Sequence, residues 1–263
     1  MYNRRMDTDP SGFIHTLWDE LADFDAARAD ESLKHLLTGL CQVANAQNAV
    51  WFGTIRMIDL LPDPVHGWRP RCFSFLHPSA PHEESAKQQS DNLDQGGVDI
   101  TAIRNVDLAG TFRANRIVDL VSEEWFESDY YHRHYKQMGN ADAIWAGIPV
   151  NEDAECYFGI FRDARHPRFT AEDRDLVAYT LRGLKWYCRR QMLSRGLMVA
   201  STPLTATERQ VLDGLLTGLS EKQIAAARHQ SAHTTHEYVT NIYRKFGVRN
   251  RAALMAFWMG KAS

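Results

Sequence analysis

The feature that most constrains this chain is a run of helix-start and helix-end signals in residues 204–248. Thr205 and Glu208 have the spacing of a capping box, and Ser220 and Gln223 repeat it. Gly218 lies between the two boxes, where a residue without a Cβ atom readily adopts the left-handed backbone that ends a helix. Apolar residues at helical spacing follow the first box, namely Val211, Leu212, Leu215, Leu216 and Leu219. These signals predict two short helices joined by a tight turn.

A third helix is predicted to begin at Ser231 or Thr234 and to end at Gly247. Its two sides differ in chemistry. The inner side carries Thr235, Tyr238, Val239, Ile242, Tyr243 and Phe246 at helical spacing. The outer side has donors, acceptors and a cation but no aliphatic side chain, and consists of His236, Glu237, Thr240, Asn241 and Arg244. Base edges in the major groove and phosphates require such a helix face.

Three separated blocks in this region carry a family resemblance. They are LTATE at the start, GLSEKQIA from Gly218 to Ala225, and NIYRKFGV from Asn241 to Val248. With these blocks, residues 204–256 resemble the LuxR-type (LuxR/FixJ) helix-turn-helix domain. The resemblance implies an all-α four-helix fold whose third helix enters the major groove of double-stranded DNA, in a protein that binds DNA as a homodimer.

The resemblance also implies roles for individual residues. His236, Glu237 and Thr240 are expected to meet base edges. Phosphate contacts are expected from Lys222, Thr234, Asn241, Arg244 and Lys245, and Thr235 is included among the DNA-binding residues. Leu254, Phe257 and Trp258 are expected to pair the C-terminal helices of two copies.

The turn before the third helix departs from the family pattern. The family usually has Leu-Gly-Ile where this chain has Arg228, His229 and Gln230, so two apolar anchors are missing. His229 occupies the glycine position, and histidine is among the side chains enriched at positive φ. Thr235 replaces a common valine. We expect the fold to hold, with weaker docking of the second helix on the third.

The charges are divided unevenly along the chain. From residue 203 onward there are eight Lys or Arg residues and four Asp or Glu residues, a net charge of +4. The remainder carries 22 basic and 29 acidic residues, a net charge of −7, from chain totals of 30 and 33. A basic small domain attached to an acidic larger one is typical of a nucleic-acid-binding module joined to something else.

The first 194 residues change their periodicity several times. Residues 13–24 and 33–46 are predicted helices, and residues 49–57, 71–76, 144–150 and 157–162 are predicted strands. Residues 80–95 are expected to be helical or loose, residues 117–138 irregularly helical, and Thr170 with Asp173 opens one long final helix. This order predicts an α+β domain with a mainly antiparallel sheet. It resembles a GAF or PAS-like sensory domain, most visibly from Tyr157 to Leu193.

The predicted organisation is therefore a sensory or dimerisation domain over residues 1–194, a linker over 195–203, and a DNA-binding domain over 204–263. A receiver domain is excluded because strands and helices do not alternate as its parallel sheet requires. We expect a cytoplasmic protein with no membrane partner, because no signal peptide or spanning segment is visible. No catalytic set, cofactor motif or metal-ligand spacing is visible, so we expect a non-enzyme without a cofactor or metal.

Aromatic residues in the first domain have two interpretations, core packing or a pocket for a small apolar or planar effector. The candidate pocket residues are Trp51, Phe73, Trp125, Tyr130, Tyr135 and Trp145. The segment from Trp125 to Asp142 also resembles the Trp/Tyr/Asp-Pro arrangement of LuxR autoinducer domains, with Ala143 in place of the proline, so an acyl-homoserine lactone is an alternative ligand. A second alternative is a protein–protein regulator whose altered turn has weakened DNA binding.

Overall fold

The computed structural model describes residues 9–57, 63–94, 97–198 and 204–259. The chain divides into two compact units. The first unit consists of Met1–Ala22 and Lys34–Lys185, and the second of Asp23–Leu33 and Trp186–Ser263. Within the described ranges, none of the helices has the length and apolar character that crossing a bilayer requires.

The first unit is built on a five-stranded sheet with the order β2-β1-β5-β4-β3. Its strands are β1 Asn48–Arg56, β2 Trp68–Phe75, β3 Arg113–Arg116, β4 Asp142–Asn151 and β5 Ala154–Arg162. All neighbouring strands pair antiparallel, as the sequence predicts. Strand β3, with the sequence RANR, was not predicted, because it has no alternation of apolar and polar residues.

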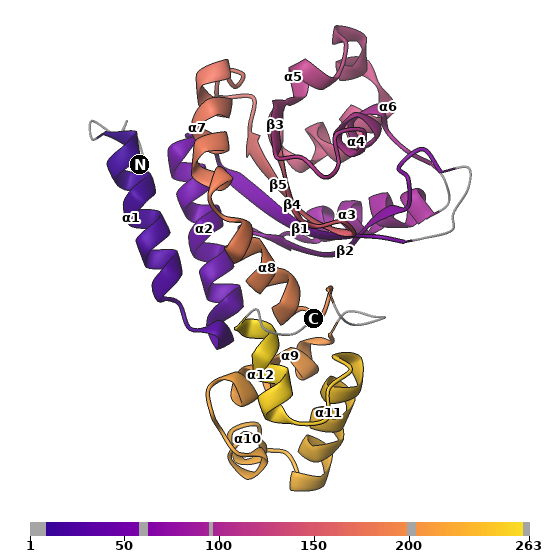
Figure 1. The fold of residues 1–263 in the computed structure, drawn as a ribbon. Helices are drawn as coiled ribbons and strands as arrows, with labels where there is room; N and C mark the ends of the chain where they lie inside the picture. The colour runs from indigo at the N-terminus through magenta and orange to yellow at the C-terminus, as the bar shows by residue number, and fades with distance from the viewer. Residues whose placement is uncertain (1–8, 58–62, 95–96, 199–203, 260–263) are drawn as a thin grey trace. The chain divides into compact units, whose positions relative to one another are not determined.

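Helices lie on both faces of this sheet (Figure 1). One face is covered by α1 Pro10–Asp23, α2 Ala29–Val43 and α7 Ala171–Arg182. The other carries α3 Ala80–Asp94 and three short helices, α4 Ile100–Val106, α5 Ile117–Leu120 and α6 Asp129–His134. The region predicted as irregularly helical, residues 117–138, is therefore α5, α6 and two 3-10 turns, Glu123–Glu127 and Lys136–Met138.

Alternation along the strands gives the two faces different side chains. Trp51 and its cross-strand partner Phe158 share one face of the sheet, and both are fully buried. Their neighbours Phe52 and Tyr157 point to the opposite face, where residues of α3 and α4 lie beside them. This second face is the one that encloses a cavity.

The sequence predicts one long final helix in the first domain, but the structure has two helices there. Thr170 and Asp173 form the predicted capping box and start α7. The helix then breaks after Arg182, and α8 Lys185–Ser194 begins after two intervening residues. Gly183 lies at the break, and glycine is a weak helix former because its backbone has the most freedom to lose.

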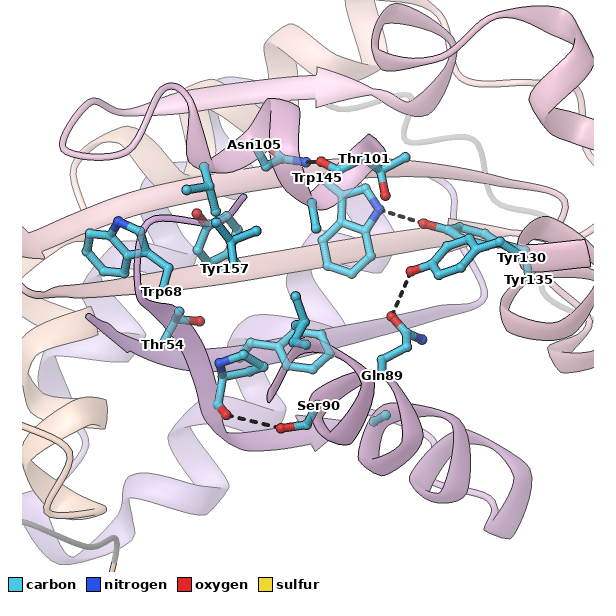
Figure 2. A pocket seen from close by; sticks show the side chains of 17 residues that line it. Thr54, Trp68, Gln89, Ser90, Thr101, Asn105, Tyr130, Tyr135, Trp145 and Tyr157 are labelled. Carbon is cyan, nitrogen blue, oxygen red and sulfur yellow. Dashed lines mark hydrogen bonds between the residues drawn. The ribbon is translucent and has the colours of Figure 1, made fainter. Parts of the chain in front are cut away.

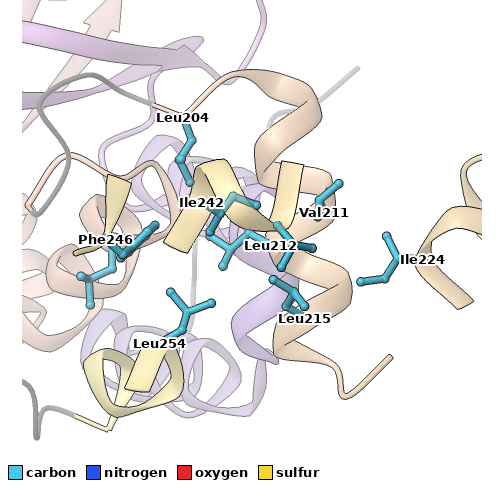
Figure 3. Packing of buried hydrophobic residues seen from close by; sticks show 10 residues of the cluster. Leu204, Val211, Leu212, Leu215, Ile224, Ile242, Phe246 and Leu254 are labelled. Atoms are coloured by element: carbon cyan, nitrogen blue, oxygen red, sulfur yellow. The ribbon is translucent and has the colours of Figure 1, made fainter. Parts of the chain in front are cut away.

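The second unit contains four helices at its C-terminal end, α9 Ala206–Leu216, α10 Glu221–Ala227, α11 Ala232–Lys245 and α12 Arg251–Trp258. They enclose one apolar core (Figure 3). Its buried members are Leu193, Leu204, Val211, Leu212, Leu215, Ile224, Val239, Ile242, Phe246 and Leu254. An antiparallel α+β domain followed by an all-α four-helix domain is the predicted fold class, which is thus confirmed.

The predicted linker, residues 195–203, is described only as far as residue 198. In that part Arg195 and Leu197 are buried, and Leu193 of α8 belongs to the four-helix core. The Arg195 guanidinium pairs with Asp30 at 2.7 Å. Residues 195–198 are therefore packed within the second unit, not exposed as a flexible linker would be.

Candidate functional site

Local backbone signals position the third helix of the C-terminal domain as predicted. Thr205 with Glu208 and Ser220 with Gln223 both form complete capping boxes. Gly218, with φ of 88°, follows the end of α9. The Ser231 hydroxyl accepts a 3.0 Å hydrogen bond from the backbone N–H of Thr234 and so caps α11. These predictions are confirmed, because each one depends on residues within one turn of the chain.

The unusual turn between α10 and α11 is formed and hydrogen-bonded. His229 has a φ of 52°, which confirms the predicted positive φ. Its N–H donates to the carbonyl of Ala226 at 3.2 Å, and the N–H of Gln230 donates to Ala225 at 3.0 Å. The turn therefore keeps its shape although histidine replaces the usual glycine.

Thr235 does not belong to the DNA-binding face, so this prediction is wrong. Its side chain is fully buried, because it lies one helical turn before Val239 on the stripe that faces the core. Among the described residues, its hydroxyl oxygen has no hydrogen-bond partner. The replacement of the family's valine thus leaves a polar atom inside the domain.

The outer face of α11 is exposed and consists of the residues predicted for it. His236, Glu237, Thr240 and Arg244 are exposed, and Asn241 is half-buried. One shallow hollow is lined by these residues together with Thr234 and Tyr238. The face therefore offers a continuous polar surface along about three turns of helix.

Two histidine–glutamate pairs lie on or beside this face. His236 Nδ1 is 2.9 Å from Glu221 Oε2 of α10, and His233 Nε2 is 3.6 Å from Glu237 Oε1. Contact of Nδ1 with a carboxylate leaves Nε2 of His236 for an outside partner. Arg244 is exposed and, among the described residues, forms no ion pair, so it carries the positive charge of this face.

The two lysines predicted to meet phosphates differ in their surroundings. Lys222 of α10 is exposed. Lys245 is half-buried, and its ammonium donates a 2.8 Å hydrogen bond to Glu208. Burial alone would raise the pKa of Glu208, but the hydrogen bonds from Lys245 and Thr205 outweigh it and lower that pKa. Lys245 therefore ties the end of α11 to the start of α9.

The residues predicted to pair two copies are divided between core and surface. Leu254 is fully buried in the four-helix core, so it is not available to a second copy, and this prediction is wrong. The reason is that α12 packs one side on the core of its own domain. Phe257 and Trp258 are half-buried, with ring centroids 5.8 and 5.6 Å from that of Phe246.

The first unit contains a cavity of about 130 Å³ on the sheet face beneath α3 to α6 (Figure 2). Three of the predicted pocket residues line it, Tyr130, Tyr135 and Trp145. Helices α3 and α4 contribute polar residues that were not predicted, namely Gln89, Ser90, Thr101 and Asn105. A smaller hollow of about 40 Å³ adjoins it and shares Phe52, Ala86, Gln89, Tyr135 and Trp145.

Hydrogen bonds fix the orientation of the polar groups around the cavity. Trp145 Nε1 donates to the Tyr135 hydroxyl at 3.0 Å, and the Tyr130 hydroxyl donates to Gln89 Oε1 at 3.0 Å. Figure 2 shows both hydroxyl ends pointing toward the middle of the group. Burial raises the pKa of Tyr130 and of Tyr135, so both stay protonated.

The other three predicted pocket residues do not line the cavity. Trp51 points to the opposite face of the sheet, and Phe73 is 38% exposed on β2. Trp125 lies behind Tyr130 and Tyr135, where its Nε1 donates to Asp99 at 3.0 Å. These positions follow from strand alternation and helix packing, which aromatic composition alone does not reveal.

Asp142, the aspartate in the segment that resembles the Trp/Tyr/Asp-Pro arrangement of LuxR autoinducer domains, also does not line the cavity. Its oxygens accept hydrogen bonds from the backbone N–H groups of Ala143 at 2.9 Å and Phe169 at 2.6 Å. Burial raises the pKa of Asp142 despite these two bonds. The carboxylate thus anchors the loop before α7.

A buried ion pair lies behind one wall of the cavity. The Arg113 guanidinium is 2.7 Å from Glu155, and both side chains are almost completely buried. Arg113 also donates to the hydroxyl of Tyr157, which lines the cavity. The pair is neutral overall and links β3 to β5 across the intervening strand β4.

Comparison with known proteins places the C-terminal region in a family. The model of the luxR family of bacterial regulatory proteins matches residues 202–258. The probable HTH-type transcriptional regulator GfsR of Streptomyces halstedii is 35% identical over 60 residues, which are 23% of this chain and 25% of that protein. The chain thus matches about a quarter of the length of this curated relative.

Solved structures of low identity also align with the chain. SdiA in complex with octanoyl-rac-glycerol has 15% identity and a TM-score of 0.46, over 97% of both chains. The VqsR LBD domain of Pseudomonas aeruginosa has 14% identity and a TM-score of 0.46, over 70% of this chain and 96% of that one. Escherichia coli SdiA has 13% identity and a TM-score of 0.46, over 97% of this chain and 100% of that one.

The capped helices α9 to α11, the tight turn at His229 and the exposed polar face of α11 define a helix-turn-helix domain. Residues 202–258 belong to the luxR family of bacterial regulatory proteins.

Proposed function

We propose that this protein is a cytoplasmic transcriptional regulator that binds specific double-stranded DNA through the outer face of α11. The observation that carries this function is the exposed polar face of that helix on a complete helix-turn-helix frame. The net charge of +4 from residue 203 onward favours a polyanionic partner over a neutral one.

The proposed DNA contacts are of two kinds: contacts to phosphates position the protein, and contacts to base edges read the sequence. His236, Glu237 and Thr240 read base edges, and Glu237 accepts from the exocyclic N4 amine of a cytosine. Phosphate contacts come from Lys222, Thr234, Asn241 and Arg244. Lys245 is left out of this set, because its ammonium is already held by Glu208.

The same proposal includes a homodimer. Specific sites for helix-turn-helix proteins are commonly read by two copies, each contacting one half-site. Phe257 and Trp258 are half-buried large hydrophobic residues near the end of α12, which is where a second copy would cover them. Leu254 has no part in this contact, because it is in the core.

We also propose that the first unit senses a small molecule in its 130 Å³ cavity. An acyl-homoserine lactone is less well supported than another ligand, because Asp142 is bound to backbone N–H groups away from the cavity. The protein–protein alternative rested on a weakened turn, and the hydrogen-bonded geometry at His229 argues against it.

A mobility-shift titration of the full chain against genomic fragments tests the proposed function. We expect tight binding to some fragments, with an affinity that falls steeply as the salt concentration rises, because phosphate contacts release counterions. Absence of binding at low salt, with and without cell extract as a source of effector, would contradict it.

A further inference from the structure

No charged side chain lines the cavity of the first unit. The described residues that line it include no Asp, Glu, Lys, Arg or His. A charged ligand placed there would lose its hydration without gaining a counterion, which costs several kcal/mol. The adjoining ion pair, Arg113 with Glu155, is internally neutralised and so offers no compensation.

The size of the cavity limits what it holds. Its volume is about 130 Å³, close to the roughly 150 Å³ of an apolar cavity that binds one benzene ring. Rings of Phe52, Trp68 and Tyr157 lie around it, so an apolar ring would gain dispersion contacts on several sides. A long acyl chain would have to extend beyond this volume, for example into the adjoining hollow of about 40 Å³.

The Tyr135 hydroxyl is arranged as a hydrogen-bond donor toward the cavity. Among the described residues its one hydrogen bond is the one it accepts from Trp145 Nε1. Its neighbour Tyr130 differs, because its proton is directed to Gln89 Oε1. Two tyrosines in the same wall thus differ in whether a proton is left for a ligand.

Asn105 provides the complementary group. Its side chain is buried in the cavity wall, and its amide nitrogen donates to the Thr101 carbonyl at 2.9 Å. In the described part of the chain its side-chain oxygen has no hydrogen-bond partner. This oxygen is fully covered, so a ligand N–H or O–H reaches it only after the Asn105 side chain rotates. A buried acceptor without a partner is costly, and that contact would remove the cost.

We propose that the cavity binds an uncharged molecule about the size of one substituted ring, with an acceptor for the Tyr135 hydroxyl and a donor for the Asn105 oxygen. This ligand class rests on the sensing role proposed above. It favours amides, lactams and similar neutral compounds over acids and amines.

Isothermal titration calorimetry of the full chain with probes of matched shape tests the ligand class. Benzamide has both polar groups, acetophenone lacks the donor, and α-methylstyrene lacks both. Benzoate and benzamidinium have the same outline with a negative or positive charge. We expect benzamide to bind about tenfold more tightly than acetophenone, and the two ions to bind at least about 100-fold more weakly than benzamide.

Two variants connect these preferences to single residues. Tyr135→Phe is expected to abolish the preference for acetophenone over α-methylstyrene, and Tyr130→Phe, the matched control, to retain it, since the Tyr130 proton is held by Gln89. Asn105→Leu is expected to abolish the preference for benzamide over acetophenone. Unchanged binding of α-methylstyrene shows that the cavity of each variant is intact.

The outcomes separate the ligand class from the sensing role. Binding of benzoate or benzamidinium as tight as that of benzamide overturns the ligand class and leaves the sensing role standing. Failure of all five probes, α-methylstyrene included, overturns the sensing role itself. If a variant does not fold, the affinities of benzamide and the two ions for the wild-type chain still test the ligand class.

Discussion

The two regions of this molecule differ in how far apart along the chain their interacting residues lie. In the C-terminal domain, each helix is started by residues three apart, such as Ser220 with Gln223, and the reading face lies on one helix. In the first unit, the cavity gathers residues from β1, β2, β4 and β5 and from α3, α4 and α6, such as Phe52 and Trp145. Function that depends on local signals is visible in a sequence, and function that depends on long-range packing is not.

The largest expected effect tests whether long-range contacts hold the first unit. Arg113→Met leaves the buried Glu155 carboxylate without its partner, and we expect the unfolding free energy of this unit to fall by about 3–5 kcal/mol. Hydrogen–deuterium exchange measures it in β3 to β5 separately from α11. Arg133→Met removes an exposed pair and should cost less than about 1 kcal/mol. Similar effects of the two variants would contradict the account.

A pH dependence is expected in the second unit. Burial, and then the nearby Asp30 carboxylate, raise the pKa of Asp213 from 3.8 to about 7. The folded unit therefore keeps a proton that the unfolded chain releases, so this contribution to stability is complete below pH 3.8 and is lost as the pH rises through about 7.

Asp213→Asn should match the wild type near pH 4 and be about 1–2 kcal/mol more stable at pH 8, after allowance for solvent screening. Urea denaturation at both pH values measures the difference, and Glu237→Gln, at an exposed acid, is the control. An advantage for Asp213→Asn that is equal at both pH values would show that the carboxylate does not titrate as described.

Particular residues show where sequence reasoning succeeded and where it ended. The positive φ of His229 and both capping boxes were predicted, because backbone sterics and capping act within a few residues. Strands β1, β2, β4 and β5 were found from their apolar composition. Gln89 was missed, since α3 is polar along most of its length and only the fold shows which of its residues meets Tyr130.

Thr235 is a place where local and long-range requirements conflict. Thr235→Val replaces a buried hydroxyl that has no partner in the described structure with a methyl group of similar size. We expect a gain in unfolding free energy of about 1 kcal/mol, measured by urea denaturation. Thr240→Val makes the same change on the exposed face and should alter stability by less than about 0.5 kcal/mol. Destabilisation by Thr235→Val would mean that its hydroxyl is satisfied in solution.

The smallest expected effect concerns the atypical turn. His229→Gly relieves a left-handed backbone, with φ of 52°, and should stabilise the domain by about 0.5–1 kcal/mol. Thermal unfolding of the full chain measures this change. His233→Gly, within helical backbone in the first turn of α11, should be destabilising instead. If both variants were destabilising, the turn would not have the conformation described.

The central claim is that the outer face of α11 reads DNA, and a binding-site selection with the wild-type chain and two variants tests it most directly. We predict that Glu237→Ala changes the preferred base at one position of each half-site, whereas Arg244→Ala weakens binding to all sequences about equally and leaves the preference intact. The reverse pattern, with base preference changed by Arg244→Ala and unaffected by Glu237→Ala, would contradict it.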